Sequence, residues 1–243
     1  MIIGNIDIVY LFANGLSHWR NQELKYSLRS LEKSSMNYRE VYIIGDKPPY
    51  LNNRIKHIHH GDNQLFCKEK RICEKIMKAC NVAEISNPFA FFNDDFFLTK
   101  PIDFSQIPFY FKGFLQNSIS KRNSNDIYTH SLRNTYDALT EKGFDTKHFD
   151  LHYPMYYDKK KFPEAMAMYD WNIKHGYVVK SLYANTLGIK GKYRADCKIM
   201  KSHDKEEILE RIKDFDLFST SEISRAIINI LNEFYPNKSS YEL

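Results

Sequence analysis

The first hundred residues alternate between strand-like and helix-like patterns, and this alternation restricts the fold more than any other feature of the chain. Residues 6–12 form a β-prone run that ends at an Asn-Gly turn pair, and residues 21–33 carry leucines at i, i+4 and i+7. Further strands are predicted at 41–44, near 55–58 and at 89–92, with a helix between the last two. Strands that alternate with helices form a mostly parallel sheet with crossover connections. The sequence therefore predicts an α/β fold.

The second half of the chain has a weaker pattern. Helices are predicted at 128–142, 206–212 and 221–234, but regular strand signals are missing. No linker-like composition separates this half from the first, and 243 residues suit one large domain. We expect a single domain, residues 1–243, with an irregular C-terminal half.

Composition and charge exclude several classes of protein. The chain has 35 Lys and Arg against 30 Asp and Glu, a net charge of +5, which would help hold a polyanion without indicating a dedicated nucleic-acid binder. Its apolar runs fall far short of the roughly 20 residues that span a bilayer, and its first residues lack the basic segment of a secretory signal. Its four cysteines lack a C-x-x-C spacing. We expect a cytoplasmic protein with reduced thiols and no membrane span.

The segment Asn93-Asp94-Asp95, directly after the strand at 89–92, carries two adjacent carboxylates within aromatic sequence. Burying such charges is costly unless a cation or hydrogen-bond donors compensate. Open α/β sheets bind ligands at the carboxyl ends of their strands, and hard oxygen ligands suit Mg²⁺ or Mn²⁺ on a diphosphate. Because neighbours in an extended segment point in opposite directions, one carboxylate is expected to bind the ion and the other to orient it. The alternative is a turn in which Asn93 and Asp94 cap backbone amides.

His152 is a second feature with catalytic chemistry, because a histidine accepts a proton near neutral pH and Pro154 restrains the chain beside it. With nine histidines in the chain, a structural role is the alternative. Two basic clusters either receive phosphate groups or form solvated surface; they are Lys68, Lys70, Arg71 and Lys75, and Lys159-Lys160-Lys161. The motifs of nucleotide-hydrolysing loops, dinucleotide folds and serine hydrolases are absent, which favours a site made of carboxylates and metal.

Three stretches occur in the order and spacing of a known family. They are residues 6–10 followed by 20–33 (R-N-Q-E-L-K-Y-S-L-R-S-L-E-K), residues 92–97 (F-N-D-D-F-F), and His152-Tyr153-Pro154. These stretches resemble the first, second and third blocks of the Stealth proteins, sugar-phosphate transferases of capsule and glycoprotein synthesis. The likeness covers roughly residues 6–160.

The chain departs from the Stealth pattern after the first strand, where members usually carry a Val-Asp-Gly-Ser-Asp-like stretch. Residues 13–17 read Ala-Asn-Gly-Leu-Ser, without either acid, and no fourth block is found. The sequence also resembles short relatives from phages and prophages, at residues 169–171, 180–189 and 235–239. This likeness implies a GT-A-like (Rossmann-like) transferase, with residues 1–100 binding the nucleotide sugar and residues 101–243 binding the acceptor.

The resemblance implies a metal-dependent glycosyltransferase that moves a sugar from a UDP- or GDP-sugar to a hydroxyl group. Mn²⁺ or Mg²⁺ is expected on Asp95, with Asp94 as a second ligand or an orienting catalytic group. His152 is expected to act as the base or to orient the acceptor, with Asp150 as its partner. Arg29 could instead form an ion pair with Glu32 or Glu23. The residues expected to contact the donor diphosphate are Arg20, Arg29, Lys70 and Asn93.

The acceptor and the reaction type stay open at the level of sequence. A hydroxymethylated base in phage DNA would fit the net positive charge, would have to leave the base stack, and would place the protein in the host cytoplasm. A capsule or cell-wall glycan fits nearly as well. The alternative reaction is Stealth-type transfer of sugar-1-phosphate. A further alternative is a non-catalytic module that binds sugar or nucleic acid.

Overall fold

The computed structural model describes residues 6–15 and 19–243; Leu16 and Ser17, the end of the stretch that departs from the Stealth pattern, lie outside the described residues. The strands are β1 (Ile6–Phe12), β2 (Ser35–Met36), β3 (Tyr38–Gly45), β4 (Lys56–His59), β5 (Phe89–Phe92), β6 (Phe97–Leu98), β7 (Ile102–Asp103), β8 (Tyr110–Phe111), β9 (Met155–Tyr157), β10 (Lys192–Tyr193), β11 (Lys198–Ile199) and β12 (Leu217–Thr220). The helices are α1 (Gln22–Ser34), α2 (Lys68–Cys80), α3 (Leu115–Ser120), α4 (Ile127–Glu141), α5 (Lys161–Met166), α6 (Val179–Thr186), α7 (Lys205–Ile212) and α8 (Arg225–Phe234).

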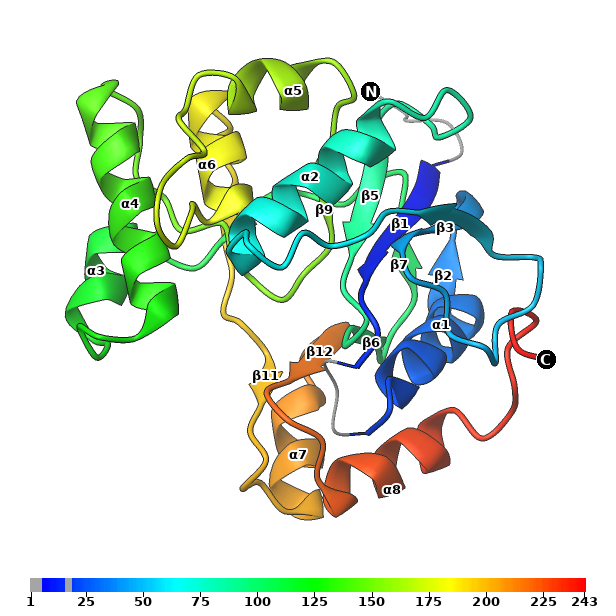
Figure 1. The fold of residues 1–243 in the computed structure, drawn as a ribbon. Coiled ribbons are helices and arrows are strands. Elements are labelled where there is room, and N and C mark those ends of the chain that lie inside the picture. Colours follow the sequence, from blue (N-terminus) through cyan, green and yellow to red (C-terminus); the bar gives the residue numbers. More distant parts are fainter. Residues whose placement is uncertain (1–5, 16–18) are drawn as a thin grey trace.

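The centre of the molecule is a five-stranded sheet with the order β4-β3-β1-β5-β9 (Figure 1). The strands β4, β3, β1 and β5 are parallel, and β9 runs antiparallel to β5 at one edge. The predicted mostly parallel α/β sheet with flanking helices is confirmed. The predicted strands and the main helices of both halves lie within a few residues of their expected positions. Within the described residues, no helix is both long and apolar enough to cross a bilayer.

Alternating side chains of the central strands pack on two separate layers, as expected for a sheet covered on both faces. On β1, Val9 joins a core shared with α2, whereas Ile8 and Tyr10 join a core shared with α1. Leu24 and Leu28 are among the α1 residues of this second core, so the leucine periodicity of the sequence marks the buried face of the helix.

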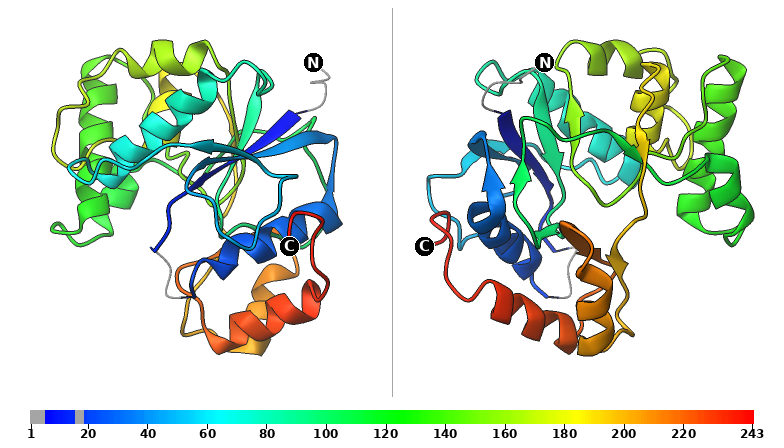
Figure 2. Two further views of the ribbon diagram at one scale, coloured as in Figure 1. Left: turned by 45° about the vertical axis from the view of Figure 1, so that its right-hand side comes forward. Right: turned by 180° about the vertical axis from the view of Figure 1, so that it is seen from behind.

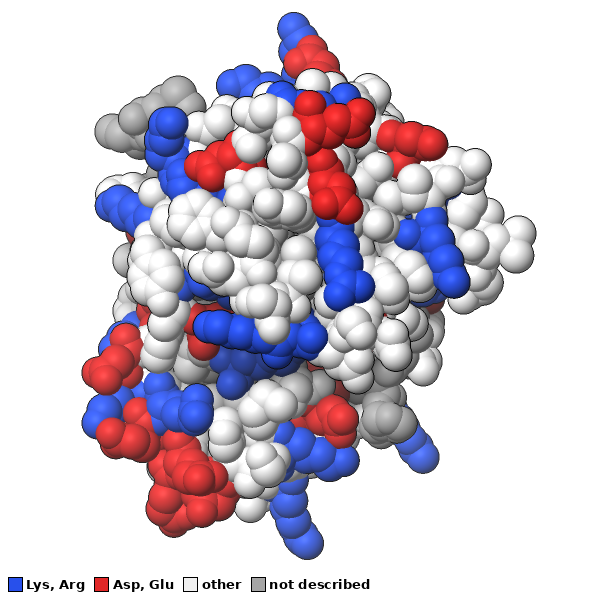
Figure 3. Space-filling view, turned by 90° about the vertical axis from the view of Figure 1, so that its left-hand side faces the viewer, with Lys and Arg blue, Asp and Glu red and all other residues white. Residues whose placement is uncertain are grey.

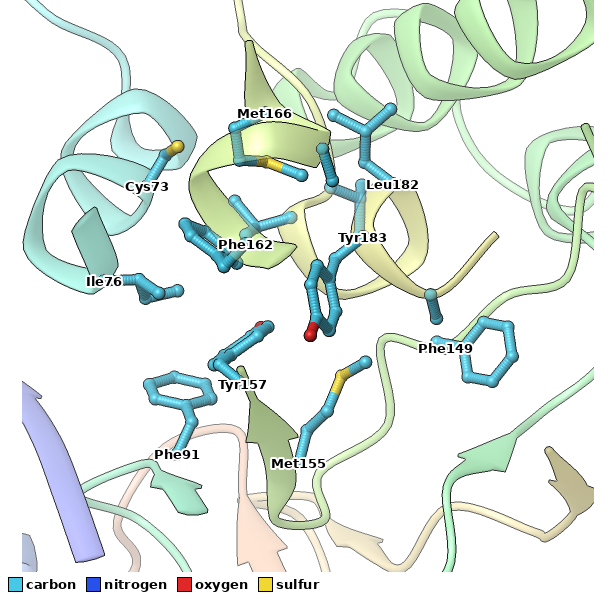
Figure 4. Close-up of a cluster of buried hydrophobic side chains, with 14 of the residues drawn as sticks. Cys73, Ile76, Phe91, Phe149, Met155, Tyr157, Phe162, Met166, Leu182 and Tyr183 are labelled. Carbon is cyan, nitrogen blue, oxygen red and sulfur yellow. The ribbon is translucent and has the colours of Figure 1, made fainter. Parts of the chain in front are cut away.

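The core on the α2 side extends well beyond that helix. Figure 4 shows side chains from α2, β5, β9, α5 and α6 meeting around Tyr157. The Tyr157 ring lies 4.9 Å from that of Phe162 on α5 and 5.0 Å from that of Tyr183 on α6, measured between centroids. These contacts attach α5 and α6, which follow β9 in the sequence, to the sheet formed mainly by the first half.

The C-terminal residues form a smaller layer below α1 in the view of Figure 1, also visible in both views of Figure 2. Here β6 pairs with β12, β12 pairs with β11, and α7 and α8 pack on this small sheet. The rings of Phe97 on β6 and Phe218 on β12 pack in a tilted arrangement, with 5.1 Å between centroids. Because β6 begins two residues after Asp95, this layer brings distant segments of the chain to the acidic pair.

Candidate functional site

The candidate site lies where the connectivity of the central sheet changes direction. From β1 the chain proceeds to β3 and β4 on one side, and it later returns to β5 on the other side of β1. In open α/β sheets the crevice outside the carboxyl ends of two such strands is the usual ligand site. Asp94 and Asp95 directly follow β5, and His152 precedes the antiparallel β9, so both features occupy this carboxyl edge.

The two carboxylates lie on a turn, here called the acidic turn, that comprises residues 93–96. The Phe96 backbone N–H donates to the Asn93 carbonyl at 3.3 Å, and Phe96 is fully buried beneath the turn. A turn at these residues was the alternative interpretation of the sequence. The extended backbone that was predicted for Asp94 and Asp95 is wrong. The two side chains nevertheless face different neighbours, as the electrostatics of the site show.

The acidic turn holds its carboxylates without a direct cationic partner among the described residues. Burial raises the pKa of Asp94, and the charges of Asp95 and Glu23 raise it further. Burial also raises the pKa of Asp95, although the charges of His152 and Lys198 oppose this rise. Two acids with pKa values shifted upward in one crevice are typical of a functional site.

His152 is oriented by Asp196, a residue that the sequence analysis did not select. The Nδ1 atom of His152 lies 2.9 Å from one carboxylate oxygen of Asp196, and the His152 backbone N–H donates to the other at 3.0 Å. Since a carboxylate only accepts hydrogen bonds, Nδ1 carries a proton, and in the neutral form of the ring Nε2 presents its lone pair. This arrangement suits a base that removes a proton from a hydroxyl group.

Asp196 is held as an anion. Burial acts to raise its pKa, but the hydrogen bond from His152 and the charges of His152 and Lys112 outweigh burial and hold the pKa well below its ordinary value. The Lys112 ammonium lies 3.0 Å from Asp196. A charged carboxylate on Nδ1 stabilises the imidazolium that forms when Nε2 takes a proton.

Cationic side chains surround this edge of the sheet. The charge of Lys68 acts on Asp94, and that of Lys198 acts on Asp95. Arg194 forms an ion pair with Asp216 and packs on Tyr153, whose hydroxyl donates to Asp216 at 3.1 Å. Figure 3 shows Lys and Arg side chains gathered near the middle of the face that looks left in Figure 1. An anionic ligand would therefore meet favourable charge.

Two predictions for this site are wrong. Arg29 does not face the crevice; it is buried and bound through two nitrogens to Glu242, at 2.7 and 2.8 Å, and its predicted ion-pair partners Glu32 and Glu23 are replaced by this C-terminal residue. Asp150 is not the partner of His152, because it accepts a hydrogen bond from Tyr128 while Asp196 occupies Nδ1. Both errors arise because the true partners lie more than forty residues away in the sequence.

Of the remaining predicted phosphate ligands, Arg20 and Lys70 lie near the starts of the two helices that flank the site. Arg20 is exposed just before α1. On α2, the Lys70 ammonium sits 3.7 Å above the ring of Phe66. Asn93 contributes its carbonyl to the acidic turn. The contacts of Arg20, Lys70 and Asn93 with a diphosphate remain predictions.

The basic cluster of α2 is not simply a solvated face. Lys75 is buried, bonds the Phe12 carbonyl at the end of β1 at 3.1 Å, and pairs with Asp62 at 2.7 Å. It therefore ties α2 to the carboxyl edge of the sheet. Gly45 makes this close approach feasible: its φ is +127°, and an added Cβ would lie 2.0 Å from the same Phe12 carbonyl oxygen.

A divalent cation fits the acidic turn only as a partner shared with substrate. In residues 6–15 and 19–243, no group of three or more His, Cys, Asp or Glu side chains is arranged to hold a metal ion. Mg²⁺, however, commonly binds through one or two carboxylates together with water and substrate phosphates. Asp94 and Asp95, whose pKa values are raised by burial, would be stabilised as anions by such an ion.

Sequence reasoning missed Asp196, Lys198 and the buried Lys180. A pattern was present, because basic residues recur at alternate positions from residue 190 to 194 and again at 198, with Asp196 between them. Nothing in that pattern indicates that the segment lies beside the acidic turn. Only the pairing of β11 with β12, and of β12 with β6, places it there.

Comparison with known proteins gives a family match for the part of the chain that contains the acidic turn. The family model for Stealth protein CR2, conserved region 2, matches residues 18–117. No curated protein matches the chain. Over these residues the chain is similar to the Stealth proteins, and this similarity points to a transferase. The match includes α1 and the acidic turn in one conserved region, whereas the sequence analysis assigned them to two separate blocks.

Proposed function

We propose that this chain is a transferase that moves sugar-1-phosphate from a nucleotide-sugar donor to a hydroxyl acceptor. The observation that carries the proposal is the position of His152, with Nδ1 held by Asp196 and its ring packed 6.5 Å from the ring of Phe96 on the acidic turn. The relationship to Stealth proteins over residues 18–117 supports it. The proposal thereby favours the phosphosugar alternative over the glycosyl transfer that the sequence placed first.

The position of the base favours attack on phosphorus. The His152 ring packs edge-on against the ring of Phe96, the residue after Asp95, with 6.5 Å between centroids, so the proposed base lies near the carboxylate proposed to hold the donor diphosphate. A hydroxyl group that binds to Nε2 of His152 would thus approach the diphosphate itself. Attack on the sugar carbon would require a base farther along the donor.

In the proposed reaction, the acceptor oxygen forms a bond to the phosphorus that carries the sugar. The bond from that phosphorus to the bridging oxygen breaks, and nucleoside monophosphate leaves. Nε2 of His152 takes the hydroxyl proton, and Asp196 stabilises the resulting imidazolium. Lys198 and Lys68 supply positive charge near the transferred and leaving phosphates.

Asp95 and Asp94 would hold Mn²⁺ or Mg²⁺. Bound there with the donor, the ion supplies charge neutralisation on the diphosphate. The acidic turn would fix the position of the ion, because the Phe96 backbone N–H is bonded to the Asn93 carbonyl and the Phe96 side chain is buried.

A second candidate is glycosyl transfer from the same donor, and one observation favours it. The residues after β1 are Ala13, Asn14 and Gly15, without the acids that Stealth members usually carry there. In this case the sugar alone moves, and nucleoside diphosphate leaves. The acceptor in either reaction would be a glycan hydroxyl or, as the sequence analysis allowed, a hydroxymethylated base of DNA.

A thermal-shift panel of UDP- and GDP-sugars, with and without Mn²⁺, tests donor binding, because a ligand of the folded state raises its stability. We expect a rise in Tm that requires both donor and Mn²⁺ and is lost in Asp95→Asn. Product analysis then decides the reaction: nucleoside monophosphate indicates phosphosugar transfer, and nucleoside diphosphate indicates glycosyl transfer. A steep loss of rate with salt would favour a DNA acceptor over a glycan. The absence of any donor-dependent shift would contradict the proposal.

A further inference from the structure

The segment that carries His152 is held by polar contacts on several sides. Asp196 binds the His152 backbone and ring, and the Tyr153 hydroxyl donates to Asp216. The carbonyl groups on either side of His152 have a common donor: the ammonium of Lys180 donates to the Leu151 carbonyl at 2.7 Å and to the Tyr153 carbonyl at 3.0 Å. One side chain thus holds the carbonyl groups of the residues on either side of the proposed base.

Lys180 is an unusual residue in this position because it is buried. It belongs to α6, only 5% of its surface is exposed, and among the described residues it forms no ion pair with a carboxylate within 4 Å. Removing an ammonium from water costs free energy that two neutral carbonyls offset only in part. If the position served packing alone, an apolar side chain would avoid this cost.

The same ammonium also contacts the acidic turn. It lies 5.4 Å from the ring centroid of Phe96, which directly follows Asp95, and 5.4 Å from that of Phe91 on β5. The Phe96 ring in turn lies edge-on to the His152 ring, with 6.5 Å between centroids. Lys180 therefore contacts both parts of the site, the histidine segment by hydrogen bonds and the acidic turn through an aromatic face.

We infer that Lys180 is a positioning residue that fixes His152 relative to the acidic turn. This inference rests on the proposed role of His152 as the base. Lys180 does not touch substrate in this arrangement. It acts through the Leu151 and Tyr153 carbonyls and through Phe96, and its removal would let the imidazole shift with respect to Asp95.

Lys159 provides a matched control elsewhere in the fold. Its ammonium also donates to backbone carbonyls, at 2.8 Å to Ile85 and at 3.3 Å to Ala83, but these belong to the connection between α2 and β5. Lys180→Met and Lys159→Met remove the same kind of contact and keep the length of the aliphatic chain. Both are expected to lower Tm, so loss of stability alone does not distinguish the two positions.

The primary measurement is the ring resonance of His152 in ¹H–¹³C and ¹⁵N NMR spectra of the full chain without ligand, assigned with His152→Gln. We expect Lys180→Met to shift this resonance or to split it into more than one position, and Lys159→Met to leave it in place. The second measurement is the release of nucleotide from UDP-glucose and GDP-mannose with Mn²⁺ below the Tm of each variant. We expect kcat of Lys180→Met to fall about 10- to 100-fold, since a displacement near 1 Å has effects of this size, with KM for the donor little changed.

An unchanged His152 resonance, or equal losses of kcat in the two methionine variants, would overturn the inference. If Lys180→Met does not fold, Lys180→Gln is judged by the same two measurements, because its shorter neutral amide cannot reach both carbonyls. If the wild-type chain releases no nucleotide from either donor, the proposed function is weakened while the NMR comparison still decides the role of Lys180.

Discussion

Two groups of partly or fully buried charges in this molecule have opposite surroundings. The Arg29–Glu242 pair joins α1 to the C-terminus, and Glu242 also accepts the Ser239 backbone N–H at 2.8 Å. Burial acts to raise the pKa of Glu242, but the hydrogen bonds from Arg29 and Ser239 lower it below the ordinary value. The pKa values of Asp94 and Asp95, in contrast, are raised, because burial there is not offset by a bonded cation.

This difference distinguishes the Arg29–Glu242 pair, which stabilises the fold, from Asp94 and Asp95, which we propose bind a ligand. Arg29 was predicted to bind a diphosphate because it is a cation on a helix next to the first strand, yet its donors are already used within the fold. The acidic turn keeps two buried carboxyl groups at the carboxyl edge of the sheet without an ion-pair partner among the described residues, and a ligand can supply positive charge there.

The largest effect is expected from Asp95→Asn. Loss of the carboxylate beside His152 removes the proposed cation ligand, and transfer should fall by about 10³-fold or more. Thermal-shift and rate measurements should both lose their dependence on Mn²⁺. Asp103→Asn is the control, because Asp103 also accepts several hydrogen bonds but from Asn37 and Ser105. Full activity of Asp95→Asn would refute the metal role.

Arg29→Met should act on stability and not on chemistry. It leaves the Glu242 carboxylate buried without its partner, and breaking such a pair costs about 3–5 kcal/mol. Urea unfolding measures this loss, and activity per folded molecule should match the wild type. The exposed Lys205–Glu233 pair is the control, since Lys205→Met should leave stability nearly unchanged. A loss of donor affinity in Arg29→Met would restore its predicted role in binding.

Asp196→Asn should lower kcat by about 100-fold or more. The amide presents N–H toward Nδ1 of His152, which favours the tautomer with the proton on Nε2, and that tautomer cannot act as the base. The pH–rate profile and kcat are the measurements, with Asp126→Asn, at the residue before α4, as the control. Wild-type turnover in Asp196→Asn would show that His152 needs no orienting carboxylate.

The smallest effect is expected from Asp94→Asn, which should raise the free energy of unfolding, whereas the other variants should lose stability or activity. Because the folded-state pKa of Asp94 is raised, the folded protein binds this proton more tightly than the unfolded chain. Ionisation therefore destabilises the fold as pH rises above the ordinary aspartate value of about 4, and the full penalty applies above the raised folded value. Without metal at pH 8, Asp94→Asn should be more stable by about 1–2 kcal/mol.

The gain in Asp94→Asn should vanish at pH 4, where the wild-type carboxyl is largely protonated in the folded state. Urea unfolding at both pH values, with chelator present, measures the difference. Equal stability of the variant and the wild type at pH 8 would mean that the acidic turn is neutralised within the fold, like the Arg29–Glu242 pair.

The sequence determined the parts of this protein that depend on local pattern. Alternating β-prone and leucine-periodic runs predicted the parallel sheet, and Asn93-Asp94-Asp95 after a buried strand placed the acidic pair at the carboxyl edge. His152 was selected by its chemistry and by resemblance to the Stealth proteins. These inferences need only the fixed periods of helices and strands and the rule that parallel strands end at one edge.

Only the tertiary structure decided which side chains lie at the carboxyl edge of the sheet and which partners they bind. Asp196 and His152 are 44 positions apart in the sequence, and Lys180 is 29 and 27 positions from the Leu151 and Tyr153 carbonyls that it binds. Glu242, which binds Arg29 away from the site, is 213 positions from it. Local periodicity gives the direction of a side chain relative to its own helix or strand. It does not give the partner, because that depends on how separate elements pack, and burial then sets whether a charge is paired within the fold or left for a ligand.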